Sequence, residues 1–486
     1  MPQKNILLVF CDQLRYDAVG ANGNGTIKTP VIDKLAARST VFDSAYTPSP
    51  VCVAARHCLH SGVPTYESGC TDNQPMPYYP SFMEILTKNG YQTHGIGKMH
   101  FALPKDNNWG FEKLELSEEG TGAPNDGFRA FLDANGYDYV RDMHGVRSEM
   151  YYIPQVSQLP ERLHCDSWVA DRSVEFLKKR DKNRPFMLMT SYIKPHPPFE
   201  NPVPWNKMYR CSDVQDSFMP ENASDLICYI NHFQNAYKYR SQGRDRNLVR
   251  TMRAAYYGCV SFLDYTLGRL FDYMEEENLF DNTLIIFTAD HGEMLGDYGC
   301  YGKRCFLEPS AHIPMIVYDP SGEGAGKRVD VPVSLYDVFP TILSYAGIDF
   351  DPNTAGESLL SVRDSDADDR TVYGQFSHGE EGLYMARDSQ YKYIFSAADN
   401  REWLFSTDAD DTSPFPNKRN ETVDIAADNP SVTAEMRARL REHFSSRGVT
   451  GMFDGGDFVR YPQKHVDPYN DKLLLRQDPP LSLPKI

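Results

Sequence analysis

The sequence lacks long hydrophobic runs, paired cysteines and an excess of positive charge. No apolar stretch approaches the roughly 20 residues of a membrane-spanning helix, so we expect no such helix. The formal net charge of −17 argues against a nucleic acid or an anionic membrane as the partner, because both bind broad basic surfaces. A site for an anion must therefore be a local group of Lys, Arg and His side chains inside a cleft.

The ten cysteines are scattered, and none belongs to a Cys-x-x-Cys pair. The chain begins Met1-Pro2-Gln3-Lys4, and the apolar run over residues 5–10 is shorter than the apolar core of a secretion signal. These features predict reduced thiols in a cytoplasmic protein without a signal peptide.

The pattern of apolar residues indicates a layered α/β protein. A chain of 486 residues has room for two or three domains. Apolar strand-like runs alternate with helical patterns, which predicts strands that are covered on both faces. The expected strands cover residues 6–10, 93–96, 186–192, 284–288 and 313–318, and a long helix is expected over residues 245–278.

The composition changes near the acidic stretch from Asp364 to Asp369. Short strand patterns follow at residues 372–376, 383–387 and 391–395, and a helical pattern spans residues 432–444. We therefore predict a catalytic domain over residues 1–365 and a smaller C-terminal domain over residues 366–486, which ends in an irregular arm.

Two of the predicted strands end in residues that suit a metal ion. Asp12 and Gln13 follow the strand over residues 6–10, and Asp290 and His291 follow the strand over residues 284–288. Open α/β sheets bind ligands at the carboxyl ends of their strands, so these four side chains could meet around one cation. Read alone, an aspartate at a strand end is most often a helix cap or a turn former.

Cationic and imidazole side chains stand beside other predicted strands. Lys98 and His100 follow the strand over residues 93–96, and Lys303 precedes the strand over residues 313–318. His196 stands between prolines after the strand over residues 186–192, and these prolines restrict its backbone. A fixed histidine of this kind suits a proton donor. Each residue taken alone also fits an ordinary surface or turn position.

A cysteine stands four residues before an arginine in Cys52-Val53-Ala54-Ala55-Arg56, and Leu59 and Gly62 complete a Leu-x-x-Gly step. Alone, this segment fits a buried cysteine at the start of a helix. Together with the strand-end motifs, it resembles the type I, formylglycine-dependent sulfatases of the alkaline phosphatase superfamily. The usual signature of that family is Cys-x-Pro-x-Arg followed by Leu-x-x-Gly, and here Ala54 replaces the proline.

The resemblance covers residues 5–347 and reaches the C-terminal domain. It implies an α/β fold with an alkaline-phosphatase-like mixed central sheet flanked by helices, followed by a smaller domain of antiparallel sheet plus helix. It also implies a sulfuric ester hydrolase in which a maturation enzyme oxidises Cys52 to formylglycine. The hydrate of that aldehyde attacks the sulfur of a small sulfate ester.

The same resemblance assigns roles to individual residues. One divalent cation, Ca²⁺ or alternatively Mn²⁺, is expected on Asp12, Gln13, Asp290 and His291, with the modified Cys52 completing the shell. Arg56, Lys98 and His100 are expected to hold the nucleophile, Lys303 to bind the sulfate oxygens, and His196 to protonate the leaving oxygen.

Several alternatives stay open. Gln13 and His291 replace the Asp and Asn of many sulfatases and resemble the choline-sulfatase and phosphonate-monoester-hydrolase branches, so a phosphonate monoester or phosphodiester hydrolase is one alternative. A second is a non-catalytic anion-binding protein, if Ala54 prevents maturation of Cys52. Asp72, Asn73 and His465 are candidates for leaving-group binding, and a sulfated sugar, an aryl sulfate and an alkyl sulfate all fit.

Overall fold

The fold is built around one mixed sheet. The structure, a computed structural model, describes residues 4–101, 108–119, 125–147, 151–239, 245–351, 354–365, 369–407 and 421–467. Within these residues, eight strands form a sheet in the order β11-β2-β10-β9-β1-β7-β4-β5. They are β1 (Asn5–Asp12), β2 (Thr40–Phe42), β4 (Gln92–Gly97), β5 (Lys113–Leu116), β7 (Phe186–Pro195), β9 (Thr283–Ala289), β10 (Met315–Tyr318) and β11 (Arg328–Val329).

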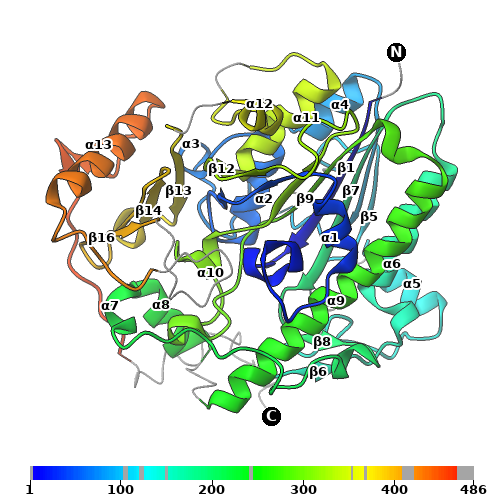
Figure 1. Ribbon diagram of the computed structural model, residues 1–486, viewed down its shortest axis with the longest axis horizontal. Coiled ribbons are helices and arrows are strands. Elements are labelled where there is room, and N and C mark those ends of the chain that lie inside the picture. Colours follow the sequence, from blue (N-terminus) through cyan, green and yellow to red (C-terminus); the bar gives the residue numbers. More distant parts are fainter. Residues whose placement is uncertain are drawn as a thin grey trace, which may run out of the picture.

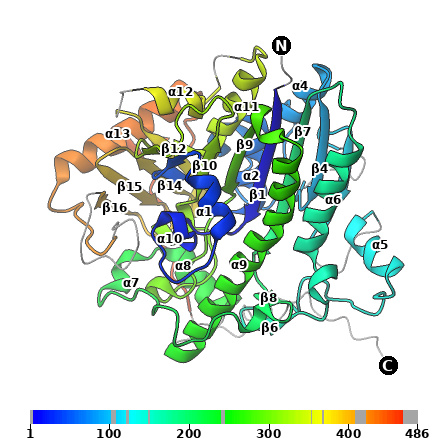
Figure 2. The same cartoon turned by 45° about the vertical axis from the view of Figure 1, so that its right-hand side comes forward.

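Five neighbouring strands, from β9 to β5, run parallel, whereas β10 is antiparallel to both β9 and β2. The parallel strands β1, β7 and β9 are buried along their whole length, as their unbroken apolar sequences predict. Helices α6 (Cys165–Lys179) and α9 (Arg246–Glu276) lie side by side on one face of the sheet, and α2 (Cys52–Ser61) lies behind it (Figures 1 and 2). The predicted mixed α/β fold is confirmed.

The long helix α9 agrees closely with the expected range of residues 245–278. Asp245 caps its start, because the side chain accepts hydrogen bonds from the backbone N–H groups of Asn247 and Leu248 at 3.0 and 2.9 Å. Its apolar residues repeat with helical spacing and are buried against the sheet and α6. In the described part of the chain, no helix combines the length and the apolar character needed to cross a bilayer.

In the described residues up to 365, the other α-helices are α1 (Pro30–Ala36), α3 (Thr65–Ser68), α4 (Phe82–Lys88), α5 (Gly127–Ala134), α7 (Ala223–Leu226), α8 (Tyr229–Phe233), α10 (Glu308–Ala311), α11 (Val338–Ala346) and α12 (Leu359–Asp364). Two-stranded pairs are formed by β3 (Ala45–Tyr46) with β12 (Val333–Ser334), and by β6 (Gln155–Val156) with β8 (Glu200–Asn201).

A second, antiparallel sheet follows in the C-terminal part. Its strands are β13 (Val372–Phe376), β14 (Leu383–Arg387), β15 (Tyr391–Ser396) and β16 (Arg401–Ser406), and α13 (Pro430–Ser446) packs on it. Alternate residues serve two cores: Leu383 and Met385 of β14 join the core of the large sheet, whereas Tyr384 and Ala386 join the core under α13. The sequence had predicted β13, β14, β15 and the helix but not β16.

The segment after Gly451 is less irregular than expected. Strands β17 (Phe453–Asp454) and β18 (Asp457–Phe458) form a short antiparallel pair, and the ring of Phe458 stacks on Phe395 with centroids 3.7 Å apart. Residues 468–486 lie outside the described residues. Residues 366–368 do as well, so the domain boundary after residue 365 stays a prediction.

Candidate active site

Two carboxylates meet at the carboxyl ends of adjacent parallel strands. Strand β1 ends at Asp12, and Asp290 directly follows β9, with which β1 pairs in parallel register. Gln13 has a φ of 66°, and its backbone N–H donates to Asp290 Oδ1 at 2.9 Å. The turns after the two strands are therefore joined, and both carboxylates are fully buried.

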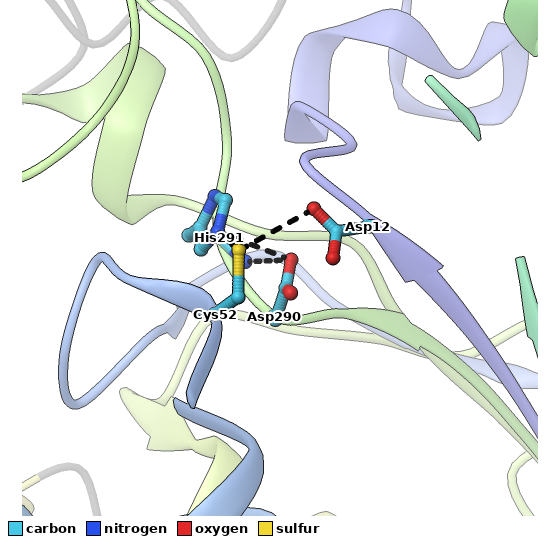
Figure 3. A group of neighbouring side chains, drawn as sticks. All are labelled: Asp12, Cys52, Asp290 and His291. Carbon is cyan, nitrogen blue, oxygen red and sulfur yellow. Dashed lines mark hydrogen bonds and ion pairs between the residues drawn. The ribbon is translucent and has the colours of Figure 1, made fainter. Parts of the chain in front are cut away.

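Cys52 begins α2 and directs its thiol toward these strand ends (Figure 3). Its Sγ lies 3.7 Å from Asp12 Oδ1 and 3.4 Å from His291 Nε2. The potential ligand atoms of Asp12, Cys52, Asp290 and His291 all lie within 4.8 Å of one another. The structure thus brings together the predicted nucleophile and three of the four predicted metal ligands, and Gln13 is adjacent to them.

Three cationic side chains from different segments surround the thiol. Lys303 Nζ donates to Cys52 Sγ at 2.9 Å and to Gln13 Oε1 at 2.8 Å. Lys98 Nζ lies 3.9 Å from the same sulfur and 2.5 Å from Asp12 Oδ2. Arg56, one turn along α2, donates to Asp12 Oδ2 at 3.1 Å. Burial of these charges at one point creates a compact site for an anion.

The two predicted histidines differ in their placement. His196 Nδ1 donates to the carbonyl of Pro197 at 2.7 Å, and its Nε2 lies 3.6 Å from Glu119 Oε1. A ring nitrogen of His196 lies within 4.8 Å of Cys52 Sγ, so the imidazole borders the site. The backbone of His100 has a φ of 51°, and its N–H donates to Glu118 Oε1 at 2.8 Å. Among the described residues, the His100 side chain is not within hydrogen-bonding distance of Cys52, and its buried Nδ1 lacks a hydrogen-bond partner.

The buried charges shift the proton affinities of the site. Burial and the Asp12 carboxylate raise the pKa of the Cys52 thiol, but Lys303, Lys98 and His291 lower it more strongly, and it lies well below its ordinary value. Burial and the charge of Asp12 raise the pKa of Asp290 to about 6. Burial also lowers the pKa of His196 to about 4.

The donor set fits a divalent cation. His291 Nδ1 donates to the carbonyl of Gly292 at 3.0 Å, which leaves the lone pair of Nε2 directed at Cys52 and Asp290. Asp290 Oδ2 is buried and accepts no hydrogen bond from the described residues. Two carboxylates, one amide oxygen and one imidazole nitrogen at a buried strand edge suit Ca²⁺ or Mn²⁺.

Two acidic residues of the site were not predicted from the sequence. Glu293 is buried and accepts from the Tyr152 hydroxyl at 2.8 Å, from the Gly302 N–H at 2.6 Å and from the Gln13 amide. Glu119 contacts Lys98, His196 Nε2 at 3.6 Å and Arg147 at 2.7 Å. Glu119 follows the end of β5, so the strand-end rule applied to that short strand would have found it.

The three residues proposed for leaving-group binding have different surroundings. The carboxylate of Asp72 is about half exposed and pairs with Arg304 at 3.4 Å. Asn73 Oδ1 accepts from the backbone N–H of Val53 at 3.2 Å and so holds the first turn of α2. His465 lines a separate cavity of about 1010 Å³ together with Tyr229 and Tyr301.

Two family models match the sequence, and so do several known proteins. A model described as sulfatase matches residues 4–348, and a model described as N-sulphoglucosamine sulphohydrolase, C-terminal, matches residues 296–445. An arylsulfatase of Clostridium perfringens is 29% identical over 442 residues, which cover 84% of this chain and 88% of the arylsulfatase. A choline-sulfatase of Rhizobium meliloti is 29% identical over 434 residues, covering 84% of this chain and 80% of that protein.

Among solved structures, the phosphonate monoester hydrolase of Agrobacterium radiobacter superposes with a TM-score of 0.75. The match covers 95% of this chain and all of that chain, at 23% sequence identity. At this identity the likeness concerns the fold.

Proposed function

The chain belongs to the sulfatase family and is a sulfuric ester hydrolase, and on this premise we propose that it works through Cys52 converted to formylglycine. The observation that supports this nucleophile most strongly is the convergence of separate segments on Cys52 Sγ. Asp12, His291 and Lys303 lie within 3.7 Å of it, although they are far apart in the sequence. A buried structural cysteine would need none of these charged neighbours.

A divalent cation, with Ca²⁺ as the first choice and Mn²⁺ as the second, would be held by Asp12, Gln13, Asp290, His291 and the modified residue 52. When bound, such a cation promotes ionisation of the hydrated aldehyde and neutralises charge on the sulfate oxygens. His291 would ligate through Nε2, since its Nδ1–H already donates to Gly292.

The residues of the chain bind and orient the ester around this centre. Lys303 would hold sulfate oxygens beside residue 52. Lys98 and Arg56 would fix Asp12 and offset the negative charge that develops at residue 52. His196 presents Nε2 to the site and would protonate the leaving oxygen. His100, which is expected to help hold the nucleophile, would do so only after its side chain turns toward residue 52, because its present contacts do not reach the sulfur.

The location and domain organisation are part of the same proposal. No disulfide joins any of the ten cysteines, and nine of them are buried, which supports a reducing, cytoplasmic environment. We also propose that residues 1–365 form the catalytic domain and residues 366–486 the smaller one, because the antiparallel sheet begins at Val372. A formylglycine-generating enzyme is the partner that this nucleophile requires.

A sulfate ester and a phosphodiester that release the same chromophore test the reaction class. We expect the purified protein to release p-nitrophenol from p-nitrophenyl sulfate with a higher kcat/KM than from bis-p-nitrophenyl phosphate. Cys52→Ala should abolish turnover while the melting temperature changes little. A clear preference for the phosphodiester would contradict the proposal.

A phosphonate monoester or phosphodiester hydrolase is the second candidate. It is favoured by the resemblance of the fold to a phosphonate monoester hydrolase, and by Gln13 and His291 at the strand ends. The transferred group of either substrate carries one negative charge, so the charges around Cys52 suit both. A non-catalytic protein would follow only if Ala54 kept Cys52 from being matured.

A further inference from the structure

A polar group outside the predicted site borders His196. Glu119 Oε1 lies 3.6 Å from His196 Nε2, and Glu119 Oε2 pairs with Arg147 at 2.7 Å. Arg147 also lies against Tyr151, with its guanidinium carbon 5.1 Å from the centre of the ring. The Tyr151 hydroxyl in turn lies 3.5 Å from His196 Nε2. These three residues form a continuous surface beside the proposed proton donor.

This surface lies where the leaving group must be. His196 can protonate the leaving oxygen only if that oxygen approaches Nε2, so the groups that touch Nε2 also border the atoms attached to that oxygen. The side chains of Glu119 and Arg147 are 16% and 35% exposed, whereas those of Asp12, Lys98 and Asp290 are fully buried. The pair is therefore accessible to the part of the substrate that lies outside the anion site.

The charges of the pair restrict what can bind there. An unpaired carboxylate within 4.8 Å of Cys52 Sγ would repel a sulfate ester, but Glu119 is paired with both Lys98 and Arg147. Glu119 retains oxygen lone pairs that accept hydrogen bonds, and Arg147 retains N–H groups that donate them. A hydroxyl group both donates and accepts, so it matches the pair. An ammonium group only donates, and Arg147 would repel it.

We propose that Glu119 and Arg147 recognise a hydroxyl group on the carbon next to the sulfate ester, which assigns the substrate to the sulfated sugars. This inference rests on the proposed function, because it uses His196 to locate the leaving group. Glu119 and Arg147 are specificity-determining residues in this scheme, whereas the chemistry belongs to residue 52.

Two aryl sulfates that differ by one hydroxyl group test the assignment. 2-Hydroxy-4-nitrophenyl sulfate carries a hydroxyl next to the ester, and p-nitrophenyl sulfate lacks it, whereas the nitro group is para to the ester in both. We expect the wild-type protein to favour 2-hydroxy-4-nitrophenyl sulfate in kcat/KM by about tenfold or more, the effect of one hydrogen bond to a charged group. Glu119→Ala and Arg147→Met should each bring the ratio of the two kcat/KM values close to one.

The ratio separates recognition from a merely structural effect. If Glu119 only held Lys98 and His196 in place, Glu119→Ala would lower both kcat/KM values by the same factor and keep the ratio, which would overturn the inference. Glu119→Gln keeps the volume of the side chain and serves if the alanine variant unfolds; it should also reduce the ratio. Glu112→Gln is the matched control. Glu112 directly precedes β5, at the end opposite to Glu119, and it also pairs with an arginine, Arg184, at 2.6 Å.

Choline O-sulfate distinguishes a hydroxyl from a cation. A loss of activity in Glu119→Ala that is confined to choline O-sulfate would make Glu119 a cation site and would overturn the sugar assignment. If the wild-type protein with formylglycine at position 52 hydrolyses none of these sulfates, the proposed function itself fails. A ratio near one in an active wild-type protein would overturn only the inference about Glu119 and Arg147.

Discussion

At the scale of single residues, the orientation of His196 decides when it can act as an acid. Its Nδ1–H donates to Pro197, so the neutral ring presents only a lone pair at Nε2 to the site. Protonation of a leaving oxygen therefore requires the imidazolium form. Burial lowers the pKa of His196 to about 4, which makes that form scarce at neutral pH until an anionic ester binds beside it.

We expect His196→Gln to lower kcat/KM about a hundredfold or more for an alkyl sulfate but much less for p-nitrophenyl sulfate, whose leaving group departs without a proton. Because the imidazolium fraction falls as the pH rises above about 4, kcat/KM for the alkyl sulfate should decline with increasing pH in the wild-type protein. The variant should lose that decline. Equal losses with both substrates would contradict the role of His196 as an acid.

The two carboxylates of the site predict how a cation affects stability. The buried carboxylates of Asp12 and Asp290 lie close together and would bind a divalent cation only in the folded protein. Adding the cation should therefore raise the melting temperature, and chelation should lower it. Asp290→Asn should weaken cation binding by about tenfold or more, measured by titration of the thermal shift.

The pH dependence of this binding has a definite sign. The pKa of Asp290 is raised to about 6, mainly by burial, so a proton competes with the cation below that value. Cation affinity should therefore fall as the pH falls through about 6. Asp133→Asn, which changes an exposed acid paired with Arg129, should leave the affinity unchanged.

The ligand residues were accessible to sequence reasoning because they follow long apolar strands. Asp12 and Asp290 end two fully buried runs, and the parallel pairing of those runs brings the acids together. Glu119 and Glu293 were not predicted for a different reason. The strand before Glu119 is short and partly exposed, and Glu293 acts through tertiary contacts to Gln13 and Tyr152 that no local pattern records.

At the scale of elements, Gly97 allows β4 to end close to β7. It has a φ of 97°, and a side chain there would place its first carbon 2.0 Å from the carbonyl oxygen of Ser191. The N–H of Lys98 donates to that same oxygen at 2.9 Å. The glycine therefore fixes where Lys98 enters the site.

Gly97→Ala should lower the free energy of unfolding by more than about 2 kcal/mol, because it combines backbone strain with a clash against main chain. Gly136→Ala is the control: Gly136 also has a positive φ, of 77°, but a side chain there would have no neighbour within 4 Å. It should cost about 1 kcal/mol in urea denaturation. Similar losses in the two variants would show that the contact with Ser191 is unimportant.

The elements themselves were predicted where apolar periodicity is strong. Strand β1 and helix α9 matched within a few residues, since burial on both faces or on one helical face leaves a clear pattern. Strand β16 was not predicted because it begins with the charged pair Arg401 and Glu402. Its pairing with β15 and the burial of Trp403 and Leu404 give it a place in the sheet.

At the scale of the whole molecule, a buried charge cluster joins the two sheets. Lys392 of β15 pairs with Glu308 at 2.9 Å and with Glu421 at 2.8 Å, and all three side chains are buried. Glu308 begins α10, whose carbonyls of Pro309 and Ser310 accept from the N–H groups of Glu293 and Gly292 at 2.8 Å. The antiparallel sheet is thus connected to the segment that carries His291.

Lys392→Met should lower the free energy of unfolding by about 3–5 kcal/mol, because it removes the lysine that pairs with two buried carboxylates. The cation affinity of the active site should fall as well, since α10 supports the turn after Asp290. Lys179→Met, at an exposed pair with Glu175, should cost about 0.5 kcal/mol or less. A loss in Lys392→Met as small as in this control would contradict a structural role for the cluster.

The central claim is that residue 52 carries an aldehyde, and mass spectrometry of the peptide that contains Cys52 tests it most directly. In protein from its native host, we predict that a fraction of this peptide contains formylglycine in place of cysteine. An aldehyde-specific hydrazide should trap that fraction. That fraction should rise and fall with the specific activity toward p-nitrophenyl sulfate. Active protein in which every Cys52 peptide retains its thiol would contradict the proposed nucleophile.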